Sequence, residues 1–573
     1  YNVNLYSEVI ALADTLKDRA FRDLDFTELE HDYNKTEIKR SWNDAGTGIT
    51  YTNPSTSGFR DAFNTVKYPF VDWNHQFIKA NNPGAPPISG PADGNPMLPS
   101  LETAFRPFIN IKYLIDRIFE ASEFTYESAF FNTTDFEKLY MDFNWGADNT
   151  PSNVSGSTYV GQAPYAATVY LLPFATSTFA NLQLGNYQNN VNVTPPNYDQ
   201  STNILTATQT NETYAISYEY TCNPGSNNIY FQWLHTNAAG VPYPAIDSVT
   251  NPTTSSGFIT YLGSFTVVMQ IGDTLEAQFR SDGIAAYQYS SFLSTVNFIK
   301  SISAVTSQTF LQTLRGELGQ WDFLKGLLTM FNLVTLVDEN NPDNIIIEPY
   351  TDVFIPTATG GTTLANRGIQ HDWTDKIDVS EMKLTPLTDL NKKTMFKFVE
   401  DDDDYSFNQY KNQVGGHLYG SYLSDAGNEF NILDGEEEIV AEPFAATLVK
   451  PLMSQFPEFI TPAIYARGGD GVWEGFENSP RIMYNNGIKS TGVSYYIPPQ
   501  NGLSSENQTN FLQFSHLSEI PTSNVIPSTT LDFHFGICQL MPGVGVPTPN
   551  NLFGLYWLPY YNELYNPNTR TMT

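Results

Sequence analysis

Histidine and cysteine side chains are the ones best suited to metal binding or nucleophilic catalysis, and this sequence spreads them thinly. The seven histidines are His31, His75, His235, His371, His417, His516 and His534, and no two have the paired spacing of a zinc site. The two cysteines, Cys222 and Cys538, cannot build a disulfide framework, so we expect two buried thiols. The sequence contains no phosphate-binding loop, dinucleotide fingerprint, Gly-x-Ser-x-Gly turn or His-Glu-x-x-His pair. It therefore predicts no catalytic residue, no cofactor-binding residue and no metal ligand.

Two acidic runs offer oxygen ligands or a contact for a basic partner. Residues 338–344, Asp-Glu-Asn-Asn-Pro-Asp-Asn, could bind Ca²⁺, but they lack a Gly-centred twelve-residue loop, so a plain hairpin turn is favoured. In residues 400–404, Glu-Asp-Asp-Asp-Asp, the four consecutive aspartates at 401–404 repel one another. A solvated loop is favoured there, and docking onto a basic partner is the alternative. Because 61 acidic residues form many pairs by chance, the sequence cannot identify a glycosidase-like carboxylate pair, and we expect the protein not to be an enzyme.

The overall charge argues against several classes of partner. With 29 basic and 61 acidic residues, the chain has a formal net charge of −32. Such a surface repels phosphate backbones and anionic lipids, so we expect no direct nucleic-acid binding. No apolar run approaches the roughly 18 residues that cross a bilayer, so we expect no membrane insertion. A hydrophobic content of 41% and an aromatic content of 14% are typical of a globular protein with sizeable cores.

The charges are distributed unevenly along the chain. Only nine charged residues fall between positions 151 and 300, although 16% of all residues are charged. This segment contains short β-branched and aromatic runs, such as residues 212–220 and 228–234, separated by turn-forming residues. Residues 264–279 have the pattern strand, Gly-Asp turn, strand, which resembles a late hairpin of trimeric jelly-roll domains such as the C1q and tumour-necrosis-factor group. We therefore predict an inserted, jelly-roll-like β-sandwich.

Helical patterns flank the insertion. Residues 107–121 and 320–333 each place apolar side chains at helical spacing, and Pro107 would stand in the first turn of the first helix. Apolar side chains on one face of each helix are more typical of core packing than of a cofactor pocket. Residues 334–349 predict a β-hairpin, residues 492–497 and 530–537 predict strands, and residues 560–566 predict a short helix that ends before Pro567.

The sequence on either side of the insertion resembles a family of tail proteins. The resemblance is carried by residues 66–70, 105–119, 321–333 and 560–570, and it spans roughly residues 60–150 and 303–573. These stretches resemble tail proteins of tailed phages that infect Bacteroidetes-type bacteria, which are in turn similar to the baseplate hub proteins that cap a phage tail tube. The resemblance implies a ring-forming structural protein, with a trimer favoured, whose hub domains continue the tail tube and whose insertion faces outward.

Together these observations predict an α+β, predominantly β fold: hub-type β domains with short amphipathic helices, interrupted by the sandwich. The segments are an N-terminal hub region (1–150), the insertion (151–301), a second hub part with a helix and a hairpin (302–400), and a C-terminal β-rich hub domain (401–573). We expect a location in the virion tail, other phage tail proteins as partners, and an insertion that contacts either a host-surface glycan or neighbouring tail proteins. The alternatives are another virion surface protein, such as a capsid or fibre protein, or a glycan-binding adhesin.

Overall fold

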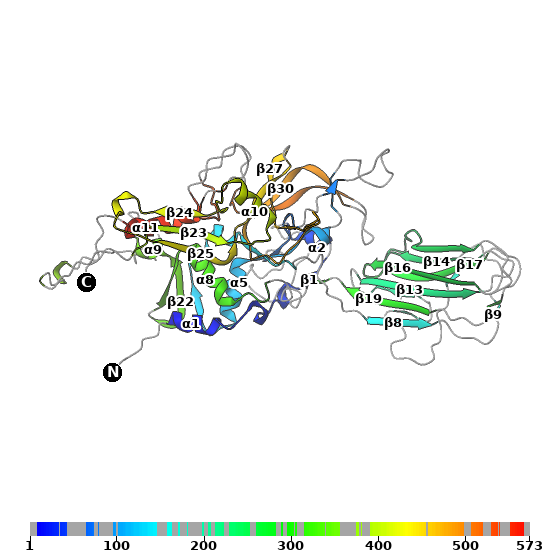
Figure 1. Ribbon diagram of the computed structural model, residues 1–573. Helices are drawn as coiled ribbons and strands as arrows, with labels where there is room; N and C mark the ends of the chain where they lie inside the picture. Colours follow the sequence, from blue (N-terminus) through cyan, green and yellow to red (C-terminus); the bar gives the residue numbers. More distant parts are fainter. Residues whose placement is uncertain are drawn as a thin grey trace.

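Two structural units are visible in the computed structural model: a large mixed body and a β-sandwich (Figure 1). In the described residues the fold is α+β and predominantly β, which confirms the predicted class. The structure describes residues 8–33, 35–42, 65–73, 78–79, 96–98, 101–145, 157–162, 170–171, 180–181, 198–199, 204–207, 212–222, 229–251, 259–281, 288–289, 295–302, 304–305, 315–338, 340–355, 374–376, 380, 390–453, 456–497, 506–519, 529–536, 538 and 550–565.

The body is built from elements on both sides of the insertion. Before it come α1 (Glu8–Leu16), η1 (Phe21–Asp23), η2 (Thr27–Leu29), β1 (His31–Asp32), α2 (Lys35–Arg40), β2 (Val66–Lys67), β3 (Ile78–Lys79), β4 (Pro96–Met97), α4 (Leu101–Ala104), β5 (Phe108–Asn110), α5 (Ile111–Glu120), β6 (Thr125–Glu127), η4 (Phe130–Asn132), α6 (Thr134–Glu137) and β7 (Leu139–Asp142). After it come α8 (Gln320–Met330), β21 (Leu333–Asp338), β22 (Asn341–Pro349), α9 (Tyr350–Phe354), η5 (Thr374–Lys376), β23 (Lys393–Val399), α10 (Tyr405–Gln413), β24 (Tyr422–Asp425), η6 (Asn428–Phe430), β25 (Glu436–Ala445), β26 (Val449–Met453), β27 (Phe456–Pro462), β28 (Ala466–Arg467), β29 (Trp473–Glu474), β30 (Ile482–Ile497), β31 (Glu506–Ser515), η7 (Phe553–Trp557) and α11 (Leu558–Leu564).

One sheet joins the two ends of the chain. Its strand order is β2-β5-β7-β30-β4-β3, with β31 also paired to β30. In the pairing of β7 with β30, Met141 stands opposite Ile482. A single cluster of buried apolar residues runs from Leu12 to Tyr561. Segments 1–150 and 401–573 therefore share this sheet, and all three segments outside the insertion contribute to one core. The boundaries drawn between them stay predictions.

The inserted segment forms two antiparallel sheets with jelly-roll topology. Its strands are β8 (Ser157–Gln162), β9 (Tyr170–Leu171), β10 (Ala180–Asn181), β11 (Tyr198–Asp199), β12 (Ile204–Thr206), β13 (Glu212–Cys222), β14 (Ile229–Thr236), β15 (Asp247–Asn251), β16 (Ile259–Met269), β17 (Thr274–Ser281), β18 (Gln288–Tyr289) and β19 (Thr295–Ile302). Strand β20 (Ala304–Val305) follows the insertion. The sheet orders are β16-β13-β19-β8 and β11-β12-β17-β14-β15. If the eight main strands are numbered in chain order, strands 6, 3, 8 and 1 form one sheet and strands 2, 7, 4 and 5 the other, which is a jelly roll.

The predicted Gly-Asp hairpin is a turn between the two sheets. The pattern strand, turn, strand is present, but β16 pairs with β13 whereas β17 pairs with β12 and β14. The prediction of a hairpin is wrong because local spacing marks a turn without identifying the partners of its strands. Gly272 adopts φ +85°, and the buried Asp273 carboxylate accepts the backbone N–H groups of Gln270 and Ala238, both at 3.0 Å. Gly272 therefore supplies the positive φ that the turn needs, and Asp273 caps backbone N–H groups in the turn.

The flanking helices agree only in part with the sequence pattern. The predicted helix at 107–121 begins later, at Ile111, because residues 108–110 form the buried strand β5 and the Asn110 side chain caps α5 by accepting the Tyr113 N–H at 3.3 Å. The prediction that Pro107 stands in the first turn is therefore wrong. The helix at 320–333, the hairpin at 334–349 and the C-terminal helix are confirmed as α8, β21 with β22, and α11. Residues 530–537 are not a strand, because the described part of this segment makes only isolated bridges.

Candidate metal centre and adjacent charged sites

Four potential metal ligands meet in the C-terminal part of the body, and we call them the C-terminal cluster. They are His516, Asp532, His534 and Cys538. One ligand atom of each lies within 4.8 Å of the others, and no other such group occurs within the ranges that the structure describes. His516 directly follows β31, whereas the other three come from a later segment that returns beside it. A bridge from Leu517 to Asp532 and a 2.7 Å hydrogen bond from Phe533 N–H to the His516 carbonyl hold these two segments together.

The Asp532 carboxylate lies at the centre of the cluster. Its Oδ1 atom is 2.7 Å from His516 Nδ1 and 3.4 Å from His534 Nδ1, and Cys538 Sγ is 3.2 Å from the same His534 nitrogen. His516, Asp532 and His534 are buried, and Cys538 is partly buried. Ligand atoms on a tetrahedral zinc ion stand about 3.3–3.8 Å apart, given bonds of about 2.0–2.3 Å. The His516 to Asp532 contact would have to lengthen, and the widest separation in the cluster, up to 4.8 Å, would have to shorten, to meet that geometry.

A second layer of contacts orients the two rings. The Tyr419 hydroxyl lies 3.3 Å from His516 Nε2, and the backbone N–H of Thr447 donates to His534 Nε2 at 3.2 Å. The Thr447 donor places the His534 ring proton on Nδ1 when no cation is bound. Gly420, at φ +77°, leaves room for this ring, because a Cβ atom there would stand 2.7 Å from His534 Cδ2. The residues around the cluster therefore hold the His516 and His534 rings in defined positions.

The ionisation of the cluster follows from its burial. Burial lowers the pKa of His534 to about 4, so this ring is neutral at pH 7. Burial and then the Asp532 carboxylate raise the pKa of the Cys538 thiol well above its usual range. Burial alone would raise the pKa of Asp532, but the rings of His516 and His534 outweigh it and hold that pKa below its usual value. Without a cation, the cluster pairs a carboxylate with a neutral His534 ring and a protonated thiol.

This arrangement suits a metal ion better than a nucleophilic triad. In a triad, one ring nitrogen of the histidine contacts the nucleophile and the other contacts the acid. Here His534 uses Nδ1 for both Cys538 and Asp532, so the ring cannot relay a proton between them. Binding a metal through Nδ1 would move the ring proton to Nε2 and remove the acceptor of the Thr447 N–H. That loss costs about 1–3 kcal/mol, which is small beside the roughly 10–16 kcal/mol of structural zinc binding.

The acidic run at 400–404 is divided between the interior and the surface. Asp404 is buried and Asp401 partly buried, and both carboxylates contact the buried guanidinium of Arg481, with Asp404 Oδ2 at 3.1 Å. Asp401 also accepts the Ser479 hydroxyl at 2.7 Å. The prediction of a solvated loop is therefore wrong for these two residues, because a distant arginine compensates their charge. Asp402 and Asp403 are exposed, as that prediction requires.

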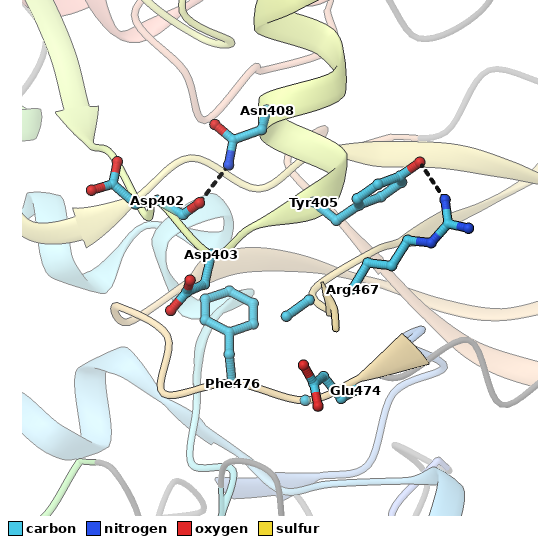
Figure 2. Close-up of a pocket in the computed structure, with 9 residues that line it drawn as sticks. Asp402, Asp403, Tyr405, Asn408, Arg467, Glu474 and Phe476 are labelled. Atoms are coloured by element: carbon cyan, nitrogen blue, oxygen red, sulfur yellow. Dashed lines mark hydrogen bonds between the residues drawn. The ribbon is translucent and has the colours of Figure 1, made fainter. Parts of the chain in front are cut away.

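The exposed half of this run lines a surface pocket of about 320 Å³ (Figure 2). Asp403 precedes α10 and Glu474 lies in β29, so the two carboxylates come from different elements. The Arg467 guanidinium, also in the pocket lining, lies 4.9 Å from the Trp473 ring and 3.5 Å from the Tyr405 hydroxyl. The pocket is acidic on balance and could accept a cationic side chain. It contains no histidine or cysteine.

The run at 338–344 spans the end of β21 and the start of β22, where Asp338 pairs with Asn341, and the predicted hairpin is confirmed. Asp338 Oδ1 accepts the Asn340 N–H at 2.9 Å, which is a turn contact rather than a cation site.

Sequence spacing alone did not identify the C-terminal cluster. His516 and His534 are too far apart for a zinc-ligand pair, and they become neighbours only because the chain returns past β31. The one local signal is Asp-x-His-x-x-x-Cys at 532–538, which places three of the four ligands within seven residues. Of the other histidines, His235 pairs with Asp273 at 2.8 Å in the sandwich, and His31 lies between the Leu29 carbonyl and the Tyr68 hydroxyl. Residues His75 and His371 lie outside the described residues.

Comparison with known proteins identifies no family. No family model matches the chain, and no curated protein matches it either. Among solved structures, murine APRIL at pH 8.5 is similar at 10% identity, covering 26% of this chain and 99% of its own, with a TM-score of 0.19. Eiger TNF from S. frugiperda is similar at 12% identity (25% and 92%, TM-score 0.20), as is the globular domain of zebrafish complement 1qA protein at 12% (26% and 96%, TM-score 0.17). The jelly-roll assignment rests on the strand pairing given above rather than on these likenesses.

Within the described part of the chain, none of the helices combines the length and the apolar composition that a bilayer crossing requires.

Proposed function

We propose that this chain is a structural protein of a phage virion, located in the tail hub or baseplate. It would form a homo-oligomeric ring, with a trimer favoured, that connects the tail tube to the distal tip or fibres and contacts other tail proteins. The observation that carries the proposal is the architecture: a jelly roll is inserted into a body whose two flanking parts share one sheet. Strand β20, just after the insertion, pairs with β1 of the body, and the sandwich lies beside the body rather than within it (Figure 1).

The chemistry of the described sites supports a structural role over an enzymatic one. The C-terminal cluster is enclosed, and its histidine geometry does not suit proton relay. The pocket beside α10 offers carboxylates and a guanidinium without a nucleophile and base in contact. We therefore propose a protein without catalytic activity, which neither binds nucleic acid directly nor inserts into a membrane.

The location and the assembly can be tested separately. Light scattering of the purified full chain at micromolar concentration measures its oligomeric state, and gold-labelled antibodies against it locate the protein on intact particles. A ring-sized oligomer together with label at the tail end supports the proposal. A monomer at these concentrations, or label spread over the capsid shell, would contradict it.

The jelly-roll topology favours a second candidate function, in which the insertion binds a host-surface glycan. Jelly rolls occur in both viral capsid and lectin domains. The chain would then be a virion surface protein or an adhesin that contacts sugars through the sandwich. A glycan array probed with the full chain tests this: binding that is lost when residues 151–301 are deleted supports it, and no binding at millimolar sugar argues for contact with neighbouring proteins instead.

A further inference from the structure

The C-terminal cluster supports an inference that is independent of the proposed function. We propose that it is a structural zinc site in which His516 Nδ1, Asp532 Oδ1, His534 Nδ1 and Cys538 Sγ bind one Zn²⁺ ion. The donor set carries this assignment, because imidazole and thiolate favour zinc, whereas Ca²⁺ and Mg²⁺ require mostly oxygen ligands. The four donors are already gathered within 4.8 Å of one another from two separate segments.

The charge balance of the site agrees with its burial. One carboxylate and one thiolate neutralise the two charges of Zn²⁺, so the loaded centre is neutral overall, as a buried site requires. Three of the four ligands are buried, and all four positions of a tetrahedron are filled by protein atoms. A closed tetrahedron leaves no position for substrate or water, which is typical of structural zinc and not of catalytic zinc.

Loading the site exchanges protons in a defined way. The proton on His534 Nδ1 and the proton that His516 Nδ1 shares with Asp532 each move, through exchange with solvent, to Nε2 of the same ring. The Cys538 thiol proton is released to solvent, and the site therefore binds zinc more tightly as pH rises. In the loaded state His516 Nε2–H donates to the Tyr419 hydroxyl, now 3.3 Å away, and so fixes the ring orientation. His534 Nε2 becomes protonated, and the contact with the Thr447 N–H opens.

Such an ion would fasten the C-terminal end of the body. The Asp532 segment also bridges to Asn551, and the Leu552 N–H donates to the His534 carbonyl at 2.9 Å. These contacts lead directly into η7 and α11, so a metal at the cluster would join the end of β31 to the last helical elements of the chain.

The test uses the purified full chain, prepared without a polyhistidine tag. After zinc loading and exhaustive dialysis, elemental mass spectrometry should find about one zinc per chain. After removal of zinc with a chelator, titration with Co²⁺ should give the visible bands of a tetrahedral site and a near-ultraviolet thiolate-to-cobalt charge-transfer band. C538S should abolish the charge-transfer band and weaken zinc binding by more than about tenfold.

Two matched variants control for unspecific effects. C222S removes the other cysteine of the chain, in β13, and H235Q removes the histidine of a buried His-Asp pair that has no thiol partner. Both should retain the full zinc content. If C538S does not fold, X-ray absorption of the zinc-loaded wild-type protein decides, because one sulfur at about 2.3 Å must appear among its ligands. A wild-type protein that holds no zinc after loading, or a metal shell without sulfur, overturns the proposal and leaves the cluster as a hydrogen-bonded network.

Discussion

Replacing Arg481 with methionine should destabilise the body far more than replacing a surface lysine. The Arg481 side chain is 1% exposed and contacts the Asp401 and Asp404 carboxylates, and its guanidinium also donates to the Ala446 carbonyl. R481M keeps most of the apolar stem but leaves two carboxylates beside each other without their cation. Removing one partner of a buried ion pair costs about 3–5 kcal/mol of unfolding free energy, because the remaining charge is buried without compensation.

The matched control breaks an exposed pair in the same part of the body. Lys393 Nζ lies 3.2 Å from Glu436, and the two side chains are 39% and 74% exposed. Because solvent screens such pairs, K393M should cost only about 0–1 kcal/mol. The double variant D404N/R481M removes one of the orphaned charges and should recover part of the loss of R481M.

The pH dependence separates a charge effect from a packing effect. Burial raises the pKa of Asp404, and the Arg481 charge partly offsets this. In R481M the offset is gone, so the folded-state pKa of Asp404 rises further. A carboxyl with a raised folded-state pKa stabilises the fold below its unfolded pKa, and that contribution is lost as pH rises through the folded value. The deficit of R481M relative to wild type should therefore be largest at neutral pH and shrink as the pH falls.

Urea unfolding followed by tryptophan fluorescence and circular dichroism measures these differences, at neutral pH and at about pH 5. The reasoning is refuted if R481M unfolds at the same urea concentration as K393M, or if its deficit is equal at both pH values. The second outcome would mean that lost packing, and not an uncompensated charge, causes the destabilisation.

Three further predictions follow from single contacts. G326A should destabilise the body by about 1–3 kcal/mol, because the added Cβ would stand 2.5 Å from the Phe444 ring, and the urea midpoint measures this. D273A removes the partner of His235 and the acceptor of two backbone N–H groups, so the unfolding transition of the sandwich should shift by about 3–5 kcal/mol while that of the body stays in place. Burial lowers the pKa of His31 to about 4, so its neutral form stabilises the fold fully above about pH 6.5 and loses this effect as pH falls toward 4. H31Q should flatten stability over that range in a pH series.

The sandwich could be predicted from the sequence because its signals are local. Alternating β-branched and aromatic residues, turn-forming residues and the scarcity of charge all act within a few positions of each other. Which strands pair with each other could not be predicted from the sequence. Ser217, for instance, stands opposite both Ser264 and Asn297, and no local pattern identifies these two neighbours. For the same reason, the sequence predicted a hairpin where the chain in fact passes from one sheet to the other, between β16 and β17.

The body and the C-terminal cluster depend on contacts between distant segments. Strand β7 pairs with β30, and the compensating charge for Asp404 is Arg481, both separated by long stretches of chain. Composition therefore marked residues 400–404 as an exposed acidic run, although Asp401 and Asp404 contact the buried Arg481 guanidinium. Likewise, His516 joins Asp532 and His534 only through the fold. The sequence shows which residues can carry charge or bind a metal, but it does not show which distant residue each of them contacts.

The buried charges of the body explain how it accommodates a long insertion. Asp142, at the end of β7, precedes the insertion, and Arg315 follows it; their side chains meet at 2.6 Å, with both residues buried. The other oxygen of Asp142 accepts the backbone N–H of Arg481 at 2.7 Å. The C-terminal part of the chain therefore also contacts the Asp142–Arg315 pair. Lengthening a closed loop costs little, about 0.6 kcal/mol per doubling. The ends of the insertion are fixed by these contacts of the body, so the length and surface of the sandwich can vary without altering the scaffold that carries it.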